Sequence, residues 1–143
     1  MKTMKLKHFI CLLPFFATAC SDDDDTAMSI RTGQWTLTHE TGYELYNGEK
    51  DEWNKTVTDR EWIIFNEDGT YTLKLDELGN GTISIIETYR YTIEGDQFIT
   101  YRKVDGDLKQ TIRRHTDTEL VLEEVSKEPD YEYKNTKTYR YEK

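Results

Sequence analysis

The chain has 143 residues and a formal net charge of −9, from 28 acidic and 19 basic residues. This balance disfavours nucleic acid as a partner, because binding to phosphates requires a basic surface. The length fits one folded domain.

The start of the chain carries an export signal. Lysines precede a short apolar run at 9–16, and small residues lead to Cys20. The run is far below the roughly 20 residues that span a bilayer as a helix, and Pro14 interrupts it. Together these features resemble a lipobox, which implies a signal peptide at 1–19 and lipidation of Cys20. Because Ala17 replaces the leucine usual in that pattern, cleavage nearby by an ordinary signal peptidase is the alternative.

An acidic stretch follows the cysteine. Residues 22–25 are all aspartate, which predicts a flexible, solvated tether over 20–30. The same run resembles the acidic signal that sends lipoproteins to the outer face of the outer membrane in some Gram-negative lineages. It therefore predicts an outer-membrane protein exposed at the cell surface. The Asp-Thr-Ala sequence around Thr26 also resembles an O-glycosylation sequon of such bacteria.

The cysteines leave no thiol in the folded domain at 31–143. Cys11 falls in the signal peptide, and Cys20 would carry lipid. Each buried methylene of an acyl chain such as palmitate contributes about 0.8 kcal/mol, so acylated Cys20 would hold the protein at membrane lipid. The domain must then fold without a disulfide. Separately, we expect the protein to be a monomer.

The folded part is predicted to be all β. Its residues are rich in Thr, Tyr and Ile, and turn sequences recur at short intervals. The predicted strands lie at 34–46, 60–66, 70–76, 82–94, 97–103, 108–115, 119–125 and 131–142. Apolar and polar residues alternate within them, as in Tyr71, Leu73 and Leu75, so one face of each is buried. Sequential hairpins favour an eight-stranded antiparallel up-and-down barrel, with a sandwich as the alternative.

A long charged insert separates the first two predicted strands. It runs from Asn47 to Asp59 and contains Trp53. Trp53 either folds back onto the barrel rim or belongs to a lid that covers one mouth and touches a ligand.

Several short motifs carry a resemblance to a known family. They are the Gly-x-Trp at 33–35 and the segments 62–71, 91–96 and 118–122. Together they resemble a bacterial lipocalin-like lipoprotein domain over 31–143. The resemblance implies that Gly33 and Trp35 open the first strand and that Trp35 plugs the closed end of the barrel. It also implies an arginine near the chain's end, here Arg140, stacked on that tryptophan as a structural clasp.

A barrel of eight strands is either filled by its own side chains or holds one small molecule. Glu87 shares its face with apolar residues and needs a polar partner, which Gln110 and Arg114 of a later strand would supply. Such a cluster would orient the polar head of a ligand. The alternative is that a bulge or register break turns Glu87 to solvent. The aromatic candidates for covering the ligand's apolar body are Trp53, Tyr71 and Tyr89.

The function predicted first is a lipid-anchored, non-catalytic module that captures a small apolar or amphipathic ligand in the barrel mouth. Neither His39 nor His115 adjoins a nucleophile motif, so no catalytic residue, metal or cofactor is expected. The second hypothesis is a surface lipoprotein with a filled barrel that binds protein or glycan through its loops. A structural accessory lipoprotein is the third. A filled interior would favour the second hypothesis over the first.

Overall fold

The computed structural model describes residues 28–143. The predicted signal peptide, Cys20, the aspartate run and Thr26 lie outside the described residues. The described part contains nine strands and no α-helix, so it holds no helix that is long and apolar enough to cross a membrane. The strands are β1 (Gly33–Tyr46), β2 (Glu49–Thr56), β3 (Glu61–Phe65), β4 (Thr70–Leu75), β5 (Ile85–Glu94), β6 (Gln97–Tyr101), β7 (Leu108–His115), β8 (Glu119–Glu128) and β9 (Tyr131–Tyr141).

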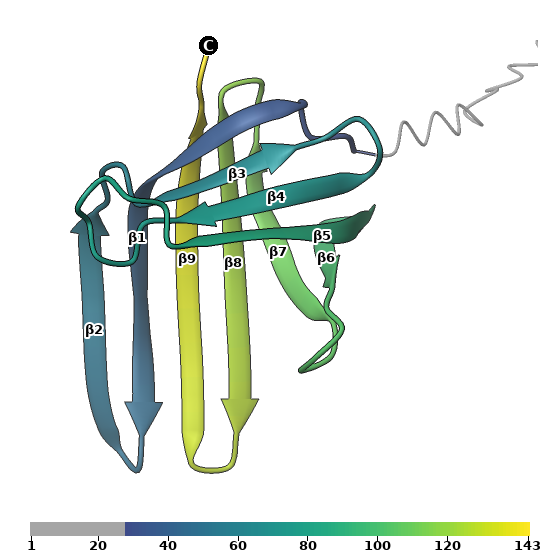
Figure 1. Cartoon of the computed structure of the whole chain (residues 1–143). Helices are drawn as coiled ribbons and strands as arrows, with labels where there is room; N and C mark the ends of the chain where they lie inside the picture. Colours follow the sequence, from purple (N-terminus) through teal and green to yellow (C-terminus); the bar gives the residue numbers. More distant parts are fainter. Residues whose placement is uncertain (1–27) are drawn as a thin grey trace, which may run out of the picture.

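Eight of these strands close into a barrel (Figure 1). From β3 to β9 each strand pairs antiparallel with the next, and β1 pairs with both β3 and β9. Closure removes the open edges that a flat sheet would expose. The predicted fold, a lipocalin-like antiparallel up-and-down barrel of eight strands, is confirmed.

The ninth strand, β2, corrects the prediction for the insert at 47–59. This segment is not a loop or a lid, because β2 forms a hairpin with the second part of β1, from His39↔Thr56 to Tyr46↔Glu49. Asn47 and Gly48 make the turn with positive φ angles of 51° and 83°, as an Asn-Gly hairpin requires. The prediction missed this strand because its residues are nearly all charged or polar, so they lack apolar alternation.

Four strand segments continue beyond the barrel wall and form a sheet that we call the extension. It comprises β2, residues 39–46 of β1, 131–137 of β9 and 124–128 of β8. The pairing of β7 with β8 ends at Thr111↔Glu123, whereas β8 and β9 stay paired as far as Glu128↔Tyr131. Figure 1 shows these long strands running away from the barrel on one side.

A bulge separates the barrel part of β1 from its part in the extension. The register with β9 shifts between Leu37 and His39, so that Leu37 faces Tyr139 and Glu40 faces Lys137. A bulge of one residue reverses which side chains point inward. Glu40 therefore takes the inward position that simple alternation would give to His39.

Trp35 closes the end of the barrel opposite the extension. Its side chain is 0% exposed, and its indole Nε1 donates a hydrogen bond to the backbone oxygen of Arg31 at 3.0 Å. The ring of Tyr141 packs edge-on against it, with centroids 5.3 Å apart. At Gly33 the φ angle is +116°, and a Cβ there would lie 2.6 Å from the hydroxyl oxygen of Tyr141. The position therefore has no room for a side chain.

The predicted clasp of Arg140 over Trp35 is wrong. Arg140 points outward because it alternates with the inward Tyr139 and Tyr141. Its side chain is 57% exposed and forms an ion pair with Glu119 at 2.5 Å. The cation–π contact at this end is made instead by Arg31, whose guanidinium lies 3.9 Å from the centre of the Tyr141 ring.

Aromatic rings fill most of the barrel between the closed end and its middle. Phe65 packs against Tyr91 and Phe98 with ring centroids 5.2 and 6.0 Å apart, and Tyr71 lies 5.7 Å from Phe98. The Tyr71 hydroxyl shares a hydrogen bond with Thr100 Oγ1 at 3.0 Å. This half of the barrel is a packed core.

Candidate functional site at the open end of the barrel

The barrel interior retains a small cavity of about 150 Å³ toward the extension. Tyr71 of β4, Gln110 of β7 and Tyr139 of β9 contribute to its wall, together with the charged side chains of Glu61 and Lys137. Typical ligand pockets measure roughly 300–1,000 Å³. The interior cavity alone is therefore too small for most ligands.

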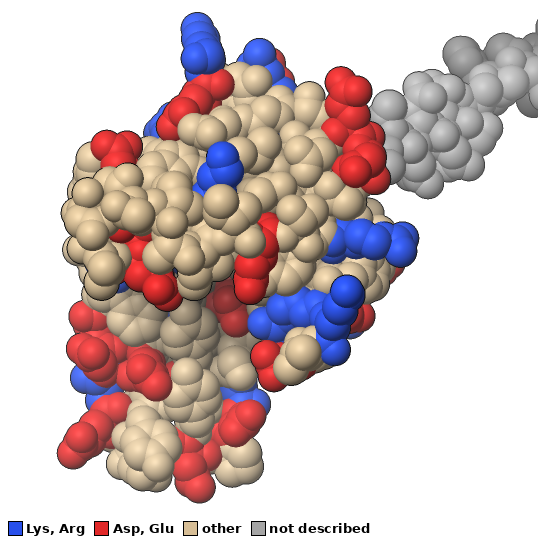
Figure 2. Space-filling model, in the orientation of Figure 1, with Lys and Arg blue, Asp and Glu red and all other residues tan. Residues whose placement is uncertain are grey.

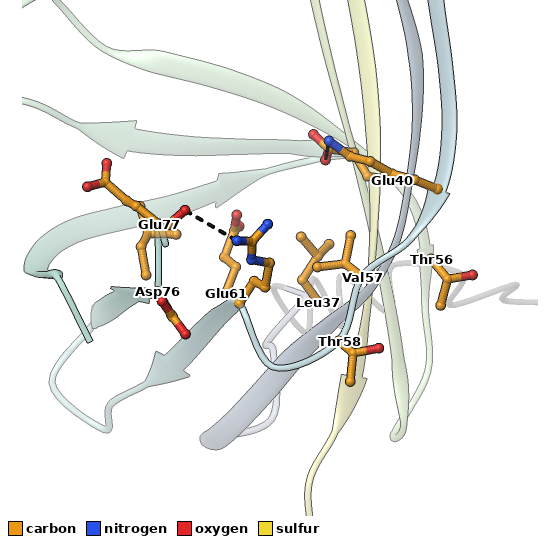
Figure 3. Close-up of a pocket in the computed structure, with 11 residues that line it drawn as sticks. Leu37, Glu40, Thr56, Val57, Thr58, Glu61, Asp76 and Glu77 are labelled. Carbon is orange, nitrogen blue, oxygen red and sulfur yellow. Dashed lines mark hydrogen bonds and ion pairs between the residues drawn. The ribbon is translucent and has the colours of Figure 1, made fainter. Parts of the chain in front are cut away.

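A second cavity of about 270 Å³ lies at the mouth, where the link from β2 to β3 passes the barrel wall. Figure 3 shows Leu37 and Val57 lying together between Glu40 and Glu61. Leu75 also lines this cavity. Because Glu61 lines both cavities, its carboxylate lies where the mouth meets the interior.

Glu61 is the centre of a buried polar cluster. It is 8% exposed, and its carboxylate accepts hydrogen bonds from Lys137 Nζ at 2.7 Å and from the Tyr139 hydroxyl at 2.5 Å. Burial and the adjacent Glu61 carboxylate raise the pKa of Tyr139 well above its usual value. The phenol therefore stays protonated and donates to Glu61 at any physiological pH.

A second network adjoins this cluster on the side of the extension. Asn135 donates to Glu40 at 2.7 Å and accepts from the indole of Trp53 at 3.2 Å, and Lys55 pairs with Glu40 at 3.0 Å. Burial opposes ionisation of Glu40, but these partners outweigh it and lower its pKa. The Trp53 ring lies over Gly42, where a Cβ would come within 2.7 Å of the indole. Trp53 thus packs against the sheet instead of covering the mouth.

The rim of the mouth cavity is held by a tight turn after β4. Asp76 is buried and accepts hydrogen bonds from the backbone N–H groups of Gly79, Asn80 and Gly81, at 2.7, 3.3 and 2.7 Å. Burial opposes its ionisation, yet the three donors prevail and lower the pKa of Asp76. Arg60 donates to the backbone oxygen of Glu77 at 3.3 Å across the cavity edge (Figure 3).

The predicted cluster of Glu87, Gln110 and Arg114 does not form. Glu87 is exposed and accepts a hydrogen bond from the Tyr89 hydroxyl. The pairing of β4 with β5 is continuous, so no bulge turns Glu87 outward. Instead, β6 ends at Tyr101, which pairs with Arg90 of β5. The part of β5 that precedes Arg90 therefore has no neighbouring strand on the β6 side. The inward face of β5 therefore opens to solvent at Glu87.

Arg114 lies outside the predicted cluster for a different reason. The register of β7 with β8 shifts between Ile112 and Arg114, which turns Arg114 away from the face of Gln110. Arg114 pairs with Glu119 at 3.0 Å on the outside of the barrel.

Two of the predicted ligand residues line a different depression. Glu87 and Tyr89 border a wide cavity of about 730 Å³ between β5 and the loop after β6. Tyr101 and Arg102 form its other side. Of the six predicted ligand residues, Tyr71 and Gln110 line the interior cavity described above.

Sequence reasoning missed Glu61 and Lys137. Each is a charged residue in the register of apolar ones, Glu61 with Ile63 and Phe65, and Lys137 with Tyr139. A charged residue at an apolar position was also the pattern that pointed to Glu87. A systematic search for charged residues on the apolar faces of strands would therefore have found Glu61, Glu87 and Lys137. The contact between Glu61 and Lys137 depends on barrel closure, which the spacing of residues does not show.

One comparison with solved structures supports the fold. No protein-family model and no curated protein matches the sequence. Apocrustacyanin C1 is similar in structure, with a TM-score of 0.50 and 9% identity over 76% of this chain and 59% of that one. The isotype 1 transferrin binding protein B of serogroup B Neisseria meningitidis gives a TM-score of 0.45 and 10% identity, over 83% of this chain and 26% of that one. The chain thus spans less than two thirds of both proteins.

At this identity the likeness to crustacyanin concerns the fold alone. Together with the closed ring of strands, it shows that residues 33–141 form a lipocalin-like barrel. Residues 28–143 contain no group of three or more His, Cys, Asp or Glu side chains arranged to hold a metal ion. What the open end offers chemically is a set of hydrogen-bond donors and acceptors beside apolar walls.

Proposed function

We propose that the protein is a lipid-anchored, non-catalytic binding module that takes a small amphipathic molecule at the open end of its barrel. The observation that carries this proposal is the buried cluster of Glu61, Lys137 and Tyr139 at the junction of two cavities. Buried charged groups cost stability unless they are paired, so a cluster of this kind inside a small barrel suggests a use in binding.

The two cavities set the size and polarity of the ligand. The filled half of the barrel excludes a long chain, so the apolar body of the ligand lies in the mouth against Leu37, Val57 and Leu75. Its polar head reaches Glu61 and Lys137 and exchanges hydrogen bonds with them. The ligand is therefore a compact molecule with one hydrogen-bonding end.

The predicted membrane anchor is compatible with ligand binding at the open end of the barrel. The described chain starts at the closed end, where Ile30 joins the core and Arg31 contacts Trp35. A tether from acylated Cys20 would join the barrel at this closed end, so it would leave the open end unobstructed. The acidic run at 22–25 supports placement on the outer membrane with cell-surface exposure.

Native mass spectrometry of the purified protein, incubated with a lipid and metabolite extract, tests ligand capture. The unmodified protein should retain a small molecule, and the double variant Glu61→Gln/Lys137→Met should lose it because the polar head has no charged partners. Glu87→Gln/Arg114→Ala is the matched control and should retain it. An unmodified protein that shows no mass shift, or a double variant that binds like the control, contradicts the proposal.

Metabolic labelling with palmitate tests the anchor independently. The native protein should incorporate label and stay with the membrane fraction, whereas Cys20→Ser should do neither. Loss of the protein from intact cells on protease treatment would support surface exposure. Equal labelling of the Cys20→Ser variant would refute lipidation at this residue.

The filled half of the barrel favours a second candidate, a surface lipoprotein that binds protein or glycan. Trp35, Phe65 and Phe98 are each at most 2% exposed, so little space remains for a ligand on that side. In this case a partner captured from whole cells should be lost in Trp53→Ala while the fold is retained. Unchanged capture by that variant would remove Trp53 from the binding surface.

A further inference from the structure

The inward face of the extension carries aromatic side chains from three of its four strands. The pairing registers place its residues in three rows across β2, β1, β9 and β8. The rows are Trp53–Gly42–Asn135–Glu124, Asp51–Glu44–Tyr133–Ser126 and Glu49–Tyr46–Tyr131–Glu128. Every row contains at least one aromatic residue and one carboxylate.

The aromatic rings form a connected surface. The rings of Trp53 and Tyr133 have centroids 5.9 Å apart, and those of Tyr133 and Tyr131 are 6.5 Å apart and nearly parallel, at 7°. Tyr46 at the far end is 60% exposed. Trp53, Tyr131 and Tyr133 are each partly exposed, so part of this aromatic surface is available to a partner.

The carboxylates of these rows have no ion-pair partner among residues 28–143. They are Glu44, Glu49, Asp51, Glu124 and Glu128. The opposite face of the same strands contrasts with this, because its acids pair with lysines, as in Lys134–Glu123 and Lys127–Glu132. Figure 2 shows acidic residues along both sides of the extension, with uncharged surface between them.

The acids of these rows lie close enough to the aromatic surface to shift the pKa of Tyr131. Burial raises the pKa of its phenol, and the carboxylates of Glu44, Glu124 and Glu128 raise it further. One tyrosine thus lies within the electrostatic reach of acids from two different strands.

This arrangement costs the free protein stability. Asp51 and Glu44 face each other directly across β2 and β1, and like charges in that position repel. A cation placed over the rings would remove the repulsion and gain both cation–π and ion-pair contacts. The face is therefore complementary to ammonium or guanidinium groups.

The spacing of the rows indicates the shape of the occupant. Neighbouring rows are two residues apart, or roughly 6.6 Å along a strand. Alternate side chains of an extended peptide have the same spacing. A chain with lysine or arginine at every second position would thus place one cation in each row.

We propose that the inward face of the extension docks a basic, extended segment of a partner protein, with its cations between the carboxylates and the aromatic rings. This docking surface lies outside the cavity at the mouth but borders the interior cavity, whose wall includes Glu124, Tyr133 and Asn135. Docking of the segment does not require the small ligand to be bound. It gives the acidic, strongly charged strand β2 a role that barrel closure does not require.

Binding of a synthetic peptide to the full-length protein in nonionic detergent tests the proposal. The probe has eight residues, with lysine alternating with threonine, and its comparison peptide carries the same four lysines in one block. Calorimetry should show tighter binding of the alternating peptide, weakened about tenfold between 20 and 200 mM salt as screening increases.

The acidic triple variant Glu44→Gln/Glu124→Gln/Glu128→Gln should weaken the alternating peptide by about tenfold or more, and Tyr131→Ala should weaken it about threefold. The matched control, Glu67→Gln/Glu94→Gln/Asp107→Asn, removes three exposed acids elsewhere and should keep nearly full affinity. Circular dichroism verifies that each variant is folded.

Three results would overturn the proposal. The first is peptide binding that survives in the acidic triple variant or falls equally in the matched control. The second is spermidine binding as tightly as the alternating peptide, which would make the surface a site for small polyamines. The third is binding of a xylo- or chito-oligosaccharide, but not of the peptide, with equal affinity in the triple variant.

Discussion

The two ends of the barrel strands differ sharply in what they bury. At the closed end, Trp35 and Phe65 pack in an apolar core that leaves little space. At the open end, the same sheet buries Glu61 and Asn135 and continues as the extension, whose inward face is acidic and aromatic. One strand can thus supply stability with one half and a binding surface with the other.

The bulge after Leu37 marks the change between these halves in β1. Before it, inward positions hold Trp35 and Leu37, and after it they hold Glu40 and Gly42. The lesson is that an apolar alternation need not run the length of a strand. Where it changes phase, the charged residues that become inward are candidates for function.

The largest expected effect is a difference in stability between variants of Trp35 and Trp53. Trp35→Ala should lower the free energy of unfolding by about 3–5 kcal/mol, because it leaves a large void in a packed core. Trp53→Ala should cost about 1 kcal/mol, since its half-buried ring packs on an exposed sheet. Urea denaturation measures both. Equal losses in the two variants would mean that the closed end does not dominate stability.

The next effect concerns the buried pair at the mouth. Lys137→Met should cost about 2–3 kcal/mol, because it leaves the Glu61 carboxylate without its cation. Adding Glu61→Gln should recover most of this loss, since the amide is uncharged and still accepts from Tyr139. A double-mutant cycle by denaturation gives both values. A double variant that is less stable than Lys137→Met would show that the pair is not the source of the cost.

Alkaline pH probes the filled half of the barrel. Burial raises the pKa of Tyr71 from 10.0 to about 12. The folded state keeps a proton that the unfolded chain releases, so stability falls as the pH rises above 10. By pH 12 the native protein should lose about 2 kcal/mol more than Tyr71→Phe. Identical alkaline profiles for the two proteins would place Tyr71 in contact with solvent.

The smallest effect lies on the outer face. The hydrogen bond from Arg113 lowers the pKa of Glu123, with further help from Lys134. Stability from these contacts is present above the unfolded pKa of 4.5 and is lost as the pH falls through the lower folded value. Glu123→Gln should cost about 1 kcal/mol at pH 7 and show a shallower loss on acidification. Denaturation at pH 7 and pH 3 measures this, and parallel losses in both proteins would argue against it.

The fold could be predicted because it is set by local patterns. Alternation in segments such as 70–76, with turn sequences between them, locates the ring of strands before any contact is known. The strand β2 escaped because alternating charges give no apolar signal. Its Asn47-Gly48 turn was the feature that could have revealed it.

The site could be predicted only in part, because it depends on contacts between distant strands. Tyr71 and Gln110 line the interior cavity, but Arg114 was placed inward by an alternation that the β7 bulge interrupts. The Glu61–Lys137 contact joins residues 76 positions apart across the closed ring. Neither a bulge nor the closing register leaves a distinct mark in the sequence.

The most direct test of the central claim is an NMR titration of the isotope-labelled protein with a lipid and metabolite extract. Binding at the open end predicts amide shift changes at Leu37, Val57, Glu61 and Lys137, with no change at Trp35 and Phe65. Changes centred on Trp35 and Phe65, or an unchanged spectrum throughout, would contradict ligand capture at the mouth.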